Sequence, residues 1–321
     1  MILSNNLILL AAYLVVAAGV TFLSIKAADY VDWIDKKTSL SGAFIGGIML
    51  SAVTSLPELF TSLSSTLMLD QPGLCIGNIL GSDLFNIMVI ALLILVFYKG
   101  FSQAHIADSH RVVLVMVLVS YLAIALNMWG ILTFEVLTIS VTSVLIIAGY
   151  IISVRHLSDE NGAADESEDD VPLTLKQIII RFVIVSIGII ALSILISYVT
   201  DAISDRFSLG KGIAGALFMG VATSLPEVAS SIALFRKKNY DIAVGNIIGS
   251  NIFNLAILGV VDIIYVGGSV YDFTDPKTVN LMYTGIVSTV LMYLALKVKN
   301  KAVRVLSLVG IVASYVLFLY L

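Results

Sequence analysis

The stretch Leu50-Ser51-Ala52-Val53-Thr54-Ser55-Leu56-Pro57-Glu58 has a second copy, Met219-Gly220-Val221-Ala222-Thr223-Ser224-Leu225-Pro226-Glu227, and the last five residues of the two copies are identical. A second matching pair follows. It consists of Gly77-Asn78-Ile79-Leu80-Gly81-Ser82-Asp83-Leu84-Phe85-Asn86 and Gly245-Asn246-Ile247-Ile248-Gly249-Ser250-Asn251-Ile252-Phe253-Asn254. The chain is therefore organised around an internal repeat, with both motifs present in each half.

The composition is that of an integral membrane protein. Of 321 residues, 59% are hydrophobic and only 12% are charged, and the mean hydropathy is +1.03, far from the values of soluble domains. The net charge of −4 comes without a clustered basic face, which argues against nucleic-acid binding. The single cysteine, Cys75, matches no metal-ligand spacing and is expected to be a small packed residue. The first 25 residues lack a basic leading segment and a clear cleavage site, so they are expected to be a retained first span.

Ten apolar windows are long enough to cross a bilayer. They lie at about 6–28, 41–68, 73–98, 111–129, 132–154, 175–200, 212–235, 241–266, 279–297 and 302–321. The second, third, seventh and eighth windows are interrupted by Gly, Ser, Asn or Pro. These four are predicted to be discontinuous helices in an all-α fold of ten spans.

The distribution of Lys and Arg predicts the orientation, since cytoplasmic connections are enriched in both. Fifteen of the 18 basic residues lie in connections after odd-numbered spans. They are Lys26, Lys36, Lys37, Lys99, Arg111, Arg155, Lys176, Arg181, Arg236, Lys237, Lys238, Lys297, Lys299, Lys301 and Arg304. We expect a multi-pass protein of the cytoplasmic membrane with both termini outside.

An acidic segment at 156–174 separates the halves 1–155 and 175–321. It holds Asp159, Glu160, Asp165, Glu166, Glu168, Asp169 and Asp170. Such a segment buries too little apolar surface to fold, so a solvated cytoplasmic linker is predicted, with calcium sensing or charge screening as the alternative. Because each half has five spans, the second half runs through the membrane in the opposite direction. This is the inverted-repeat architecture of many secondary transporters, whose sites lie between the repeats near the midplane.

The two Pro-Glu pairs mark the predicted site. Pro57 and Pro226 each remove a backbone donor, and such breaks persist in a membrane only beside buried protein or a watery cavity. Glu58 and Glu227 place charge in mid-membrane, which is costly and therefore points to function.

The repeats also offer neutral oxygen ligands of the kind that hard cations such as calcium and sodium prefer. Hydroxyls come from Ser55, Ser224, Ser82 and Ser250, and amide oxygens from Asn86 and Asn254. Within each repeat the second serine and the asparagine are four residues apart, on one helix face. The alternative is that these polar residues only join helices by hydrogen bonds. A soft-metal or redox site is disfavoured, since the motifs contain neither Cys nor His.

Asp83 is predicted to lie near mid-membrane, about ten residues into the third span. A helix step of about 100° turns it away from the face of Ser82 and Asn86. Two readings stay open: a group that supports the site or carries a proton, and a carboxyl hydrogen-bonded within the bundle.

The remaining ionisable groups carry no predicted role in the site. His105, His110 and His156 are expected to be solvated in the cytoplasmic connections, and Glu135 and Asp262 to be interfacial.

Both repeats resemble the alpha-repeats of the calcium/cation antiporter superfamily, in particular its sodium/calcium exchanger branch. The resemblance covers about 45 residues in each half and implies exchange of sodium for calcium at one central site. The ligands it implies are Glu58, Glu227, Ser55, Ser224, Ser82, Ser250, Asn86 and Asn254, with backbone carbonyls of Thr54, Thr223, Ser51 and Gly220. It further implies that several sodium ions replace one calcium ion and that the first and sixth spans slide over the core.

Departures from relatives bear on the coupling ion. Proton-coupled relatives carry a glutamate soon after Gly-Asn, where this chain has Gly-Ser, which favours sodium. Potassium-dependent relatives have an aspartate at the position of Asn254, which disfavours potassium. The predicted function is therefore calcium/sodium antiport. The transported ions and membrane lipid are the expected partners, and neither a cofactor nor an obligate protein partner is predicted.

Three alternatives are weighed against this prediction. The nearest is a proton/calcium, or other divalent cation, exchanger on the same scaffold, which Asp83 supports. An intramembrane enzyme is disfavoured, because paired catalytic carboxyls take different roles whereas these two lie in symmetric copies. A passive channel is disfavoured, since a midplane cluster of carboxylates suits tight binding better than conduction.

Overall fold

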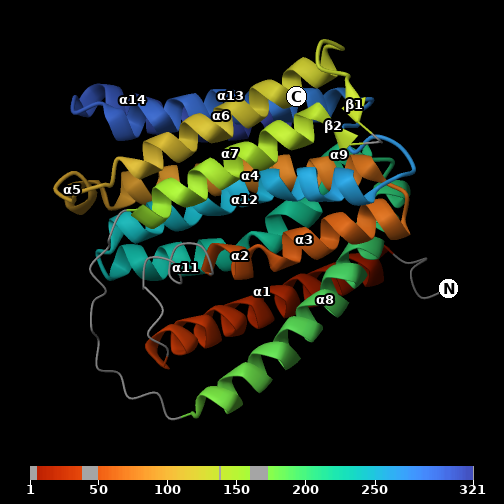
Figure 1. The fold of residues 1–321 in the computed structure, drawn as a ribbon, viewed down its shortest axis with the longest axis horizontal. Coiled ribbons are helices and arrows are strands. Elements are labelled where there is room, and N and C mark those ends of the chain that lie inside the picture. The colour runs from red at the N-terminus through yellow and green to blue at the C-terminus, as the bar shows by residue number, and fades with distance from the viewer. Residues whose placement is uncertain (1–5, 38–49, 137–138, 160–172, 321) are drawn as a thin grey trace.

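The computed structural model describes residues 6–37, 50–136, 139–159 and 173–320, and these are almost entirely helical (Figure 1). The first half contains α1 (Asn6–Lys37), α2 (Leu50–Thr54), α3 (Leu56–Leu63), the π-helix η3 (Ser64–Met68), α4 (Pro72–Val96), α5 (Tyr98–Phe101), α6 (Ser109–Met128) and α7 (Val141–Asp159). The second contains α8 (Leu175–Arg206), α9 (Lys211–Ala214), the π-helix η4 (Gly215–Gly220), α10 (Val221–Thr223), α11 (Leu225–Arg236), α12 (Tyr240–Ile264), α13 (Pro276–Lys297) and α14 (Lys301–Tyr320). Strands β1 (Glu135–Val136) and β2 (Ile139–Ser140) form an antiparallel pair.

Several helices begin where the sequence carries start signals. At α8, Thr174 and Gln177 form a capping box. The Gln177 backbone N–H donates to the Thr174 hydroxyl oxygen over 3.4 Å, and the Thr174 backbone N–H donates to the side-chain oxygen Oε1 of Gln177 over 3.0 Å. At α13, Asp275 accepts from the Lys277 amide over 2.9 Å, and Pro276 takes the first helical position. The helix ends therefore satisfy backbone donors that would otherwise lack partners.

Within the described ranges, seven helices are long and apolar enough to cross a membrane, and the two helical parts Lys211–Thr223 and Leu225–Arg236 form an eighth candidate bent by 45°. The described part of the span at 41–68 is α2, α3 and η3, and α7 supplies a shorter apolar helix, Val141–His156. The protein is thus a multi-pass membrane protein. The count of ten spans, their inverted arrangement and the division at 156–174 stay predictions; most of the acidic segment lies outside the described residues.

The predicted breaks are correct for two of the four windows. The chain leaves helical geometry at Ser55, between α2 and α3, and at Ser224, between α10 and α11, in both cases before a proline. The expectation of discontinuous helices in the third and eighth windows is wrong, because α4 and α12 are each continuous over 25 residues. Glycine and asparagine in these helices are tolerated because neighbouring segments pack on them closely, and neither helix interior contains a proline.

Helices α13 and α14 lie on one side of the molecule and α1 and α8 on the opposite side, with the other long helices between them (Figure 1). The main apolar core is built from α4, α6, α12, α13 and α14, with single contributions from neighbouring elements. Helices α1 and α8 contribute no residue to it and lie against each other along one side. Of the most apolar stretch, 67% is buried in α4 and 78% in α12, but only 28% in α1 and 17% in α8. α4 and α12 are therefore central, and α1 with α8 forms an outer layer.

Connections rich in Lys and Arg gather at one end of the helices. Figure 1 shows α5 and the C-terminal end of α11 at this end, whereas the start of α1 and the β1–β2 pair lie at the other. The basic residues of 236–238 and 297–304 belong to connections at the first end. Which end faces the cytoplasm remains a prediction from the charge distribution.

Candidate cation-binding site

Glu58 and Glu227 each occupy the first turn of a helix that restarts after a break. Glu58 lies in α3 and Glu227 in α11, and both side chains are completely buried. The N-terminus of a helix carries partial positive charge and favours a carboxylate there. The break thus places two acidic groups in the interior, each supported by the backbone of its own repeat.

The two repeats exchange hydrogen bonds at these glutamates. The Ser55 hydroxyl donates to Oε1 of Glu227 over 3.4 Å, and the Ser224 hydroxyl donates to Oε1 of Glu58 over 3.2 Å. In both carboxylates the second oxygen, Oε2, is buried without a hydrogen-bond partner among the described residues. Each carboxylate therefore retains one acceptor that a cation or a proton would satisfy.

The backbone at the two breaks has the same conformation. Ser55 has φ −90° and ψ 10°, and Ser224 has φ −87° and ψ 0°, in the sparsely occupied bridge region. The carbonyl of Ser51 accepts from the Ser55 amide and the Thr54 hydroxyl, over 3.0 Å and 3.2 Å. In the second repeat the carbonyl of Gly220 accepts from the Ser224 amide and the Thr223 hydroxyl, over 3.2 Å and 3.4 Å. The predicted backbone ligands thus lie beside the predicted hydroxyl ligands.

Helices α4 and α12 bring the second motif of each repeat to the same interior. Ser82, Asn86, Ser250 and Asn254 are all completely buried. The Ser82 hydroxyl donates to the Gly220 carbonyl over 3.2 Å, which links α4 to the break in the other repeat. Within the part of the chain described, Oδ1 of Asn86, Oδ1 of Asn254 and Oγ of Ser250 accept no hydrogen bond. These oxygens are the ligand type that calcium and sodium prefer.

Asp83 is buried and contacts one of the predicted ligands. The helix period predicts only that it turns away from the face of Ser82 and Asn86; in the structure Asn254 of α12 donates from Nδ2 to Oδ1 of Asp83 over 3.2 Å. Oδ2 of Asp83 has no partner within the described ranges. Asp83 is therefore connected to the site through Asn254, and its role stays a prediction.

The asparagine of each Gly-Asn pair is a structural residue that sequence reasoning named only as part of a glycine motif. Asn78 donates from Nδ2 to the Thr61 and Ser62 side-chain oxygens, over 3.0 Å and 3.1 Å, and to the Glu58 carbonyl over 3.4 Å. In the second repeat Asn246 donates to the Ser230 hydroxyl over 3.1 Å. Recurrence of Asn directly after Gly in both repeats was the available signal.

Glycine at 220 permits the close approach that brings the two repeats together. A Cβ at this position would lie 2.9 Å from the Asn78 carbonyl oxygen and 2.9 Å from the Ser82 amide nitrogen. Both atoms are backbone of α4, so neither could move aside cheaply. Any larger residue would push η4 away from α4 and from the Ser82 hydrogen bond.

One expectation outside the site is wrong. His110 is buried at 6% exposure rather than solvated, because its Nε2 lies 3.0 Å from Oδ1 of Asp241 in α12. Asp262 lies near the C-terminal end of α12 and is buried at 2% exposure, where it accepts from the Ser140 amide and the Ser143 hydroxyl; its level at the membrane interface stays a prediction. Cys75 is buried and His105 and His156 are exposed, as predicted. Glu135 is exposed, and its interfacial placement stays a prediction.

The apolar helices and the buried oxygen groups shared between two repeats define a membrane transport protein. A family model described as "Sodium/calcium exchanger protein" matches residues 6–158 and 178–321. The chain therefore belongs to the sodium/calcium exchanger protein family. It is a transporter rather than an enzyme, and the predicted resemblance is confirmed.

Two individual relatives match a large part of the chain. The inner membrane protein YrbG of Escherichia coli (strain K12) is 30% identical over 223 residues, which are 67% of this chain and 66% of that protein. The putative antiporter CaxA of Alkalimonas amylolytica is 26% identical over 273 residues, or 81% and 82% of the two chains.

Two solved structures with this fold belong to exchangers that use different coupling ions. The sodium-calcium exchanger NCX_Mj superposes with a TM-score of 0.62 at 22% identity, covering 98% of both chains. The H⁺/Ca²⁺ exchanger CAX superposes with a TM-score of 0.65 at 14% identity, covering 97% of this chain and 87% of that one. The fold therefore does not separate sodium from proton coupling, and the choice rests on individual residues.

Proposed function

We propose that the protein is a secondary active antiporter that exchanges calcium for sodium by alternating access. The observation that carries the proposal is the pair of buried glutamates, each bonded by a serine of the other repeat and each retaining one unpaired buried oxygen within the described structure. Two carboxylates balance the charge of one calcium ion. Charged groups this deep in a membrane protein are costly unless they serve an ion path.

The proposed ligands come equally from the two repeats. They are Glu58, Glu227, Ser55, Ser224, Ser82, Ser250, Asn86, Asn254 and the backbone carbonyls of Thr54, Thr223, Ser51 and Gly220. The neutral oxygens among them suit both ions, because sodium and calcium are hard cations. Both ions would then compete for the same glutamates. That competition couples the two fluxes, and several sodium ions replacing one calcium ion makes the cycle electrogenic.

The outer layer of α1 and α8 supports a sliding movement. These helices contact the remainder through small apolar clusters, one of Val16, Ala17, Val20, Ile196 and Ala222 and another of Ala27, Val31, Val53 and Ile189. Neither cluster is part of the main core. A shift of the α1–α8 layer would therefore leave the core packing unchanged while it exposes the site on alternate sides. Small sliding of packed helices is a recognised mode of such changes.

Proton/calcium exchange on the same scaffold is the second candidate. The observation in its favour is Asp83, a buried carboxyl that is hydrogen-bonded to Asn254 and has one oxygen without a described partner. Against it stands the asymmetry of the repeats, since the equivalent position in the second repeat is Asn251. Residence in the cytoplasmic membrane, with both termini outside, is part of either proposal and rests on the Lys and Arg distribution.

Calcium uptake into proteoliposomes tests the proposal directly. Sodium, proton and potassium gradients are imposed in turn, each at fixed membrane potential, and uptake of radioactive calcium is followed. Uptake driven by a sodium gradient alone is the expected result. Uptake driven only by a proton gradient would favour proton/calcium exchange over sodium/calcium exchange. No uptake under any gradient would contradict both proposals.

A further inference from the structure

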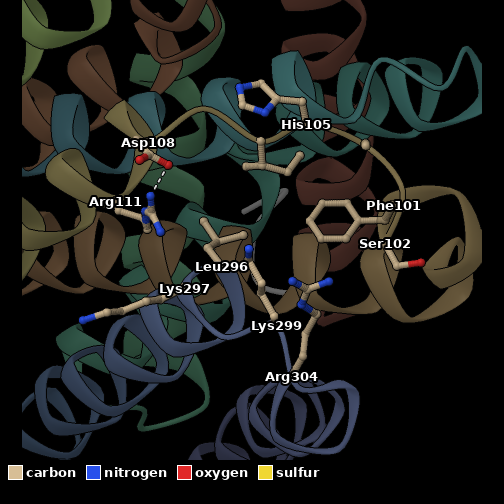
Figure 2. A pocket seen from close by; sticks show the side chains of 11 residues that line it. Phe101, Ser102, His105, Asp108, Arg111, Leu296, Lys297, Lys299 and Arg304 are labelled. Atoms are coloured by element: carbon tan, nitrogen blue, oxygen red, sulfur yellow. Dashed lines mark ion pairs between the residues drawn. The ribbon is translucent and has the colours of Figure 1, made fainter.

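A second polar site lies far from the glutamates, at the end of the molecule where the basic connections gather. The connection after α5 faces the connection between α13 and α14 across a pocket of about 370 Å³ (Figure 2). Its lining residues are Phe101, Ser102, Ala104, His105, Ile106, Asp108, Arg111, Leu296, Lys297, Lys299 and Arg304. The candidate spans α6, α13 and α14 begin or end here, at Ser109, Lys297 and Lys301. The pocket therefore lies at the level where helices leave the apolar part of a membrane.

The pocket carries an excess of positive charge. Its lining holds four cations, Arg111, Lys297, Lys299 and Arg304, and a single carboxylate, Asp108, which pairs with Arg111. Among the described residues, Lys297, Lys299 and Arg304 make no ion pair, although Lys297 lies 5.3 Å from the centre of the Tyr293 ring. Figure 2 shows that Lys299 and Arg304 extend toward Leu296 and Phe101, whereas Lys297 extends away from them. Two cations are thus directed into the pocket without a counter-charge in the described structure.

Arg304 is held in place by neutral groups. Its Nε donates to the Ala295 carbonyl over 3.0 Å, and its Nη2 donates to the Val298 carbonyl over 3.1 Å, at the C-terminal end of α13. These bonds fix the planar guanidinium while its full charge remains available. A positioned guanidinium beside a lysine is a common arrangement for binding a phosphate group.

The surroundings of the pocket favour an amphiphile over a free ion. Phe101 and Leu296 give it apolar walls beside the cations. On α14, Val303 is 40% exposed and Leu306 is 70% exposed, within one turn of Arg304. These side chains lie about 100° and 200° around α14 from Arg304, so they face outward on the helix beside the pocket and do not line it. A molecule with a negative head and apolar tails matches both features, and basic pockets between membrane helices are known to hold lipid head groups.

We propose that this pocket binds the phosphate of an anionic membrane lipid, with Lys299 and Arg304 as the groups that contact it. The site is independent of the exchange site, because none of its residues belongs to either repeat motif. Bound there, the lipid would bridge the connection before α6 and the connection between α13 and α14, which are about 190 residues apart in sequence.

Native mass spectrometry of the purified full-length protein tests the proposal. Delipidated protein is titrated with phosphatidylglycerol, with phosphatidylcholine and with inorganic phosphate. We expect phosphatidylglycerol to bind more tightly than phosphatidylcholine. In Lys299→Gln its affinity should fall about fivefold, since one surface cation contributes roughly that factor. Arg304→Lys keeps the charge but loses the planar fork, so a smaller loss of about two- to threefold is expected if the guanidinium binds phosphate.

Lys237→Gln is the matched control, because Lys237 is an exposed lysine in a connection at the same end and outside the pocket. It should bind phosphatidylglycerol as the unmodified protein does. Equal losses in Lys237→Gln and Lys299→Gln would reduce the effect to general surface charge and overturn the proposal. Equal binding of the two lipids would also overturn it. Saturation by inorganic phosphate alone, with the same dependence on Lys299, would assign the pocket to the free ion instead of a lipid.

Discussion

Asn254 in α12 donates a hydrogen bond to the Asp83 carboxylate in α4 over 3.2 Å. The repeat-related bond runs from Asn86 to Oδ1 of Asn251 over 3.0 Å, so the two contacts are copies of one arrangement. Asn251 also donates from Nδ2 to the backbone carbonyl of Asp83, over 3.0 Å. A carboxylate at position 83 has no N–H group, so it cannot make the equivalent bond to the backbone carbonyl of Asn251. Its Oδ2 also lacks a partner among the described residues. An amide at position 83 would supply both an acceptor and a donor.

Asp83→Asn is therefore expected to leave sodium-driven calcium exchange nearly unchanged. The amide keeps an acceptor for Asn254 and adds the donor that the repeat-related position already has. The measurement is sodium-driven calcium uptake into proteoliposomes over a range of pH, compared with the unmodified protein. If Asp83 carries protons, the substitution will flatten the pH dependence. Loss of proton-driven uptake in this variant, with sodium absent throughout, would promote proton/calcium exchange.

Asp262→Asn is expected to act on stability instead of transport. Asp262 is also a buried aspartate, but its Oδ2 accepts from the Ser140 amide over 2.9 Å and from the Ser143 hydroxyl over 2.6 Å. Loss of the charge weakens both bonds, which should lower the free energy of unfolding by about 1–3 kcal/mol. Thermal unfolding in detergent should shift downward, while transport per folded protein stays the same. A transport defect without a shift in unfolding would assign Asp262 a role in the ion path.

Glu58→Gln and Glu227→Gln should each abolish calcium transport, with losses on the order of 100-fold or more. Each removes one of two charges that balance calcium while it keeps the side-chain shape, and loss of a buried charge partner costs ~3 kcal/mol or more. Gln also keeps an acceptor for the serine of the other repeat, so folding should survive. Calcium uptake and thermal unfolding of both purified variants decide the matter. Near-normal exchange in either variant would refute the proposed cluster.

Ser250→Ala and Ser82→Ala should lower calcium affinity to the same extent but should differ in their effect on stability. Each removes one neutral ligand, and a loss of about tenfold in calcium affinity is expected for both. Ser82 also donates to the Gly220 carbonyl, so its loss costs about 1 kcal/mol of folding free energy, whereas Oγ of Ser250 has no partner within the described ranges. Calcium titration and unfolding are measured in parallel. Unchanged calcium affinity in both variants would confine these serines to helix packing.

Sequence reasoning could predict the positions of the breaks, because proline removes a backbone donor wherever it stands. It could also predict burial of Glu58 and Glu227, since each lies in an apolar stretch and recurs in a repeat. The prediction failed for α4 and α12, where glycine and asparagine looked like interruptions. In the structure Gly220 and the glycines of α4 serve close packing between segments, and Asn78 bonds to α3, so the helix continues.

Contacts between segments that are distant in the chain could not be predicted from the sequence. The period of one helix correctly turns Asp83 away from Ser82, yet it says nothing of what α12 presents at that point. The same limit applies to His110, whose partner Asp241 is 131 residues away, and to Asp262, whose donors lie 119 and 122 residues away. Each was predicted from its distance to a span end, and each is buried because a second element supplies its partner.

Asn254→Asp should make exchange sensitive to pH or to potassium. The new carboxylate would lie beside Asp83, whose Oδ1 is 3.2 Å from Nδ2 of Asn254. Two adjacent carboxylates cannot both stay charged in a cation-free interior without a large cost, so one must take up a proton or a cation. The measurement is sodium-driven calcium uptake over a range of pH and potassium concentrations. Unchanged kinetics across both variables would place Asn254 outside the site.

The double variant Asp83→Asn/Asn254→Asp separates the total charge from its position. It restores one carboxyl and one amide to the contact between α4 and α12, with their places exchanged. If the pH or potassium sensitivity of Asn254→Asp comes from the crowding of two carboxyls, the double variant should lose it and regain near-normal uptake. If it comes from a carboxylate at position 254 acting on the transported ion, the double variant should keep it. Retention of the sensitivity, with unfolding like that of the unmodified protein, would show that position 254 binds the ion itself.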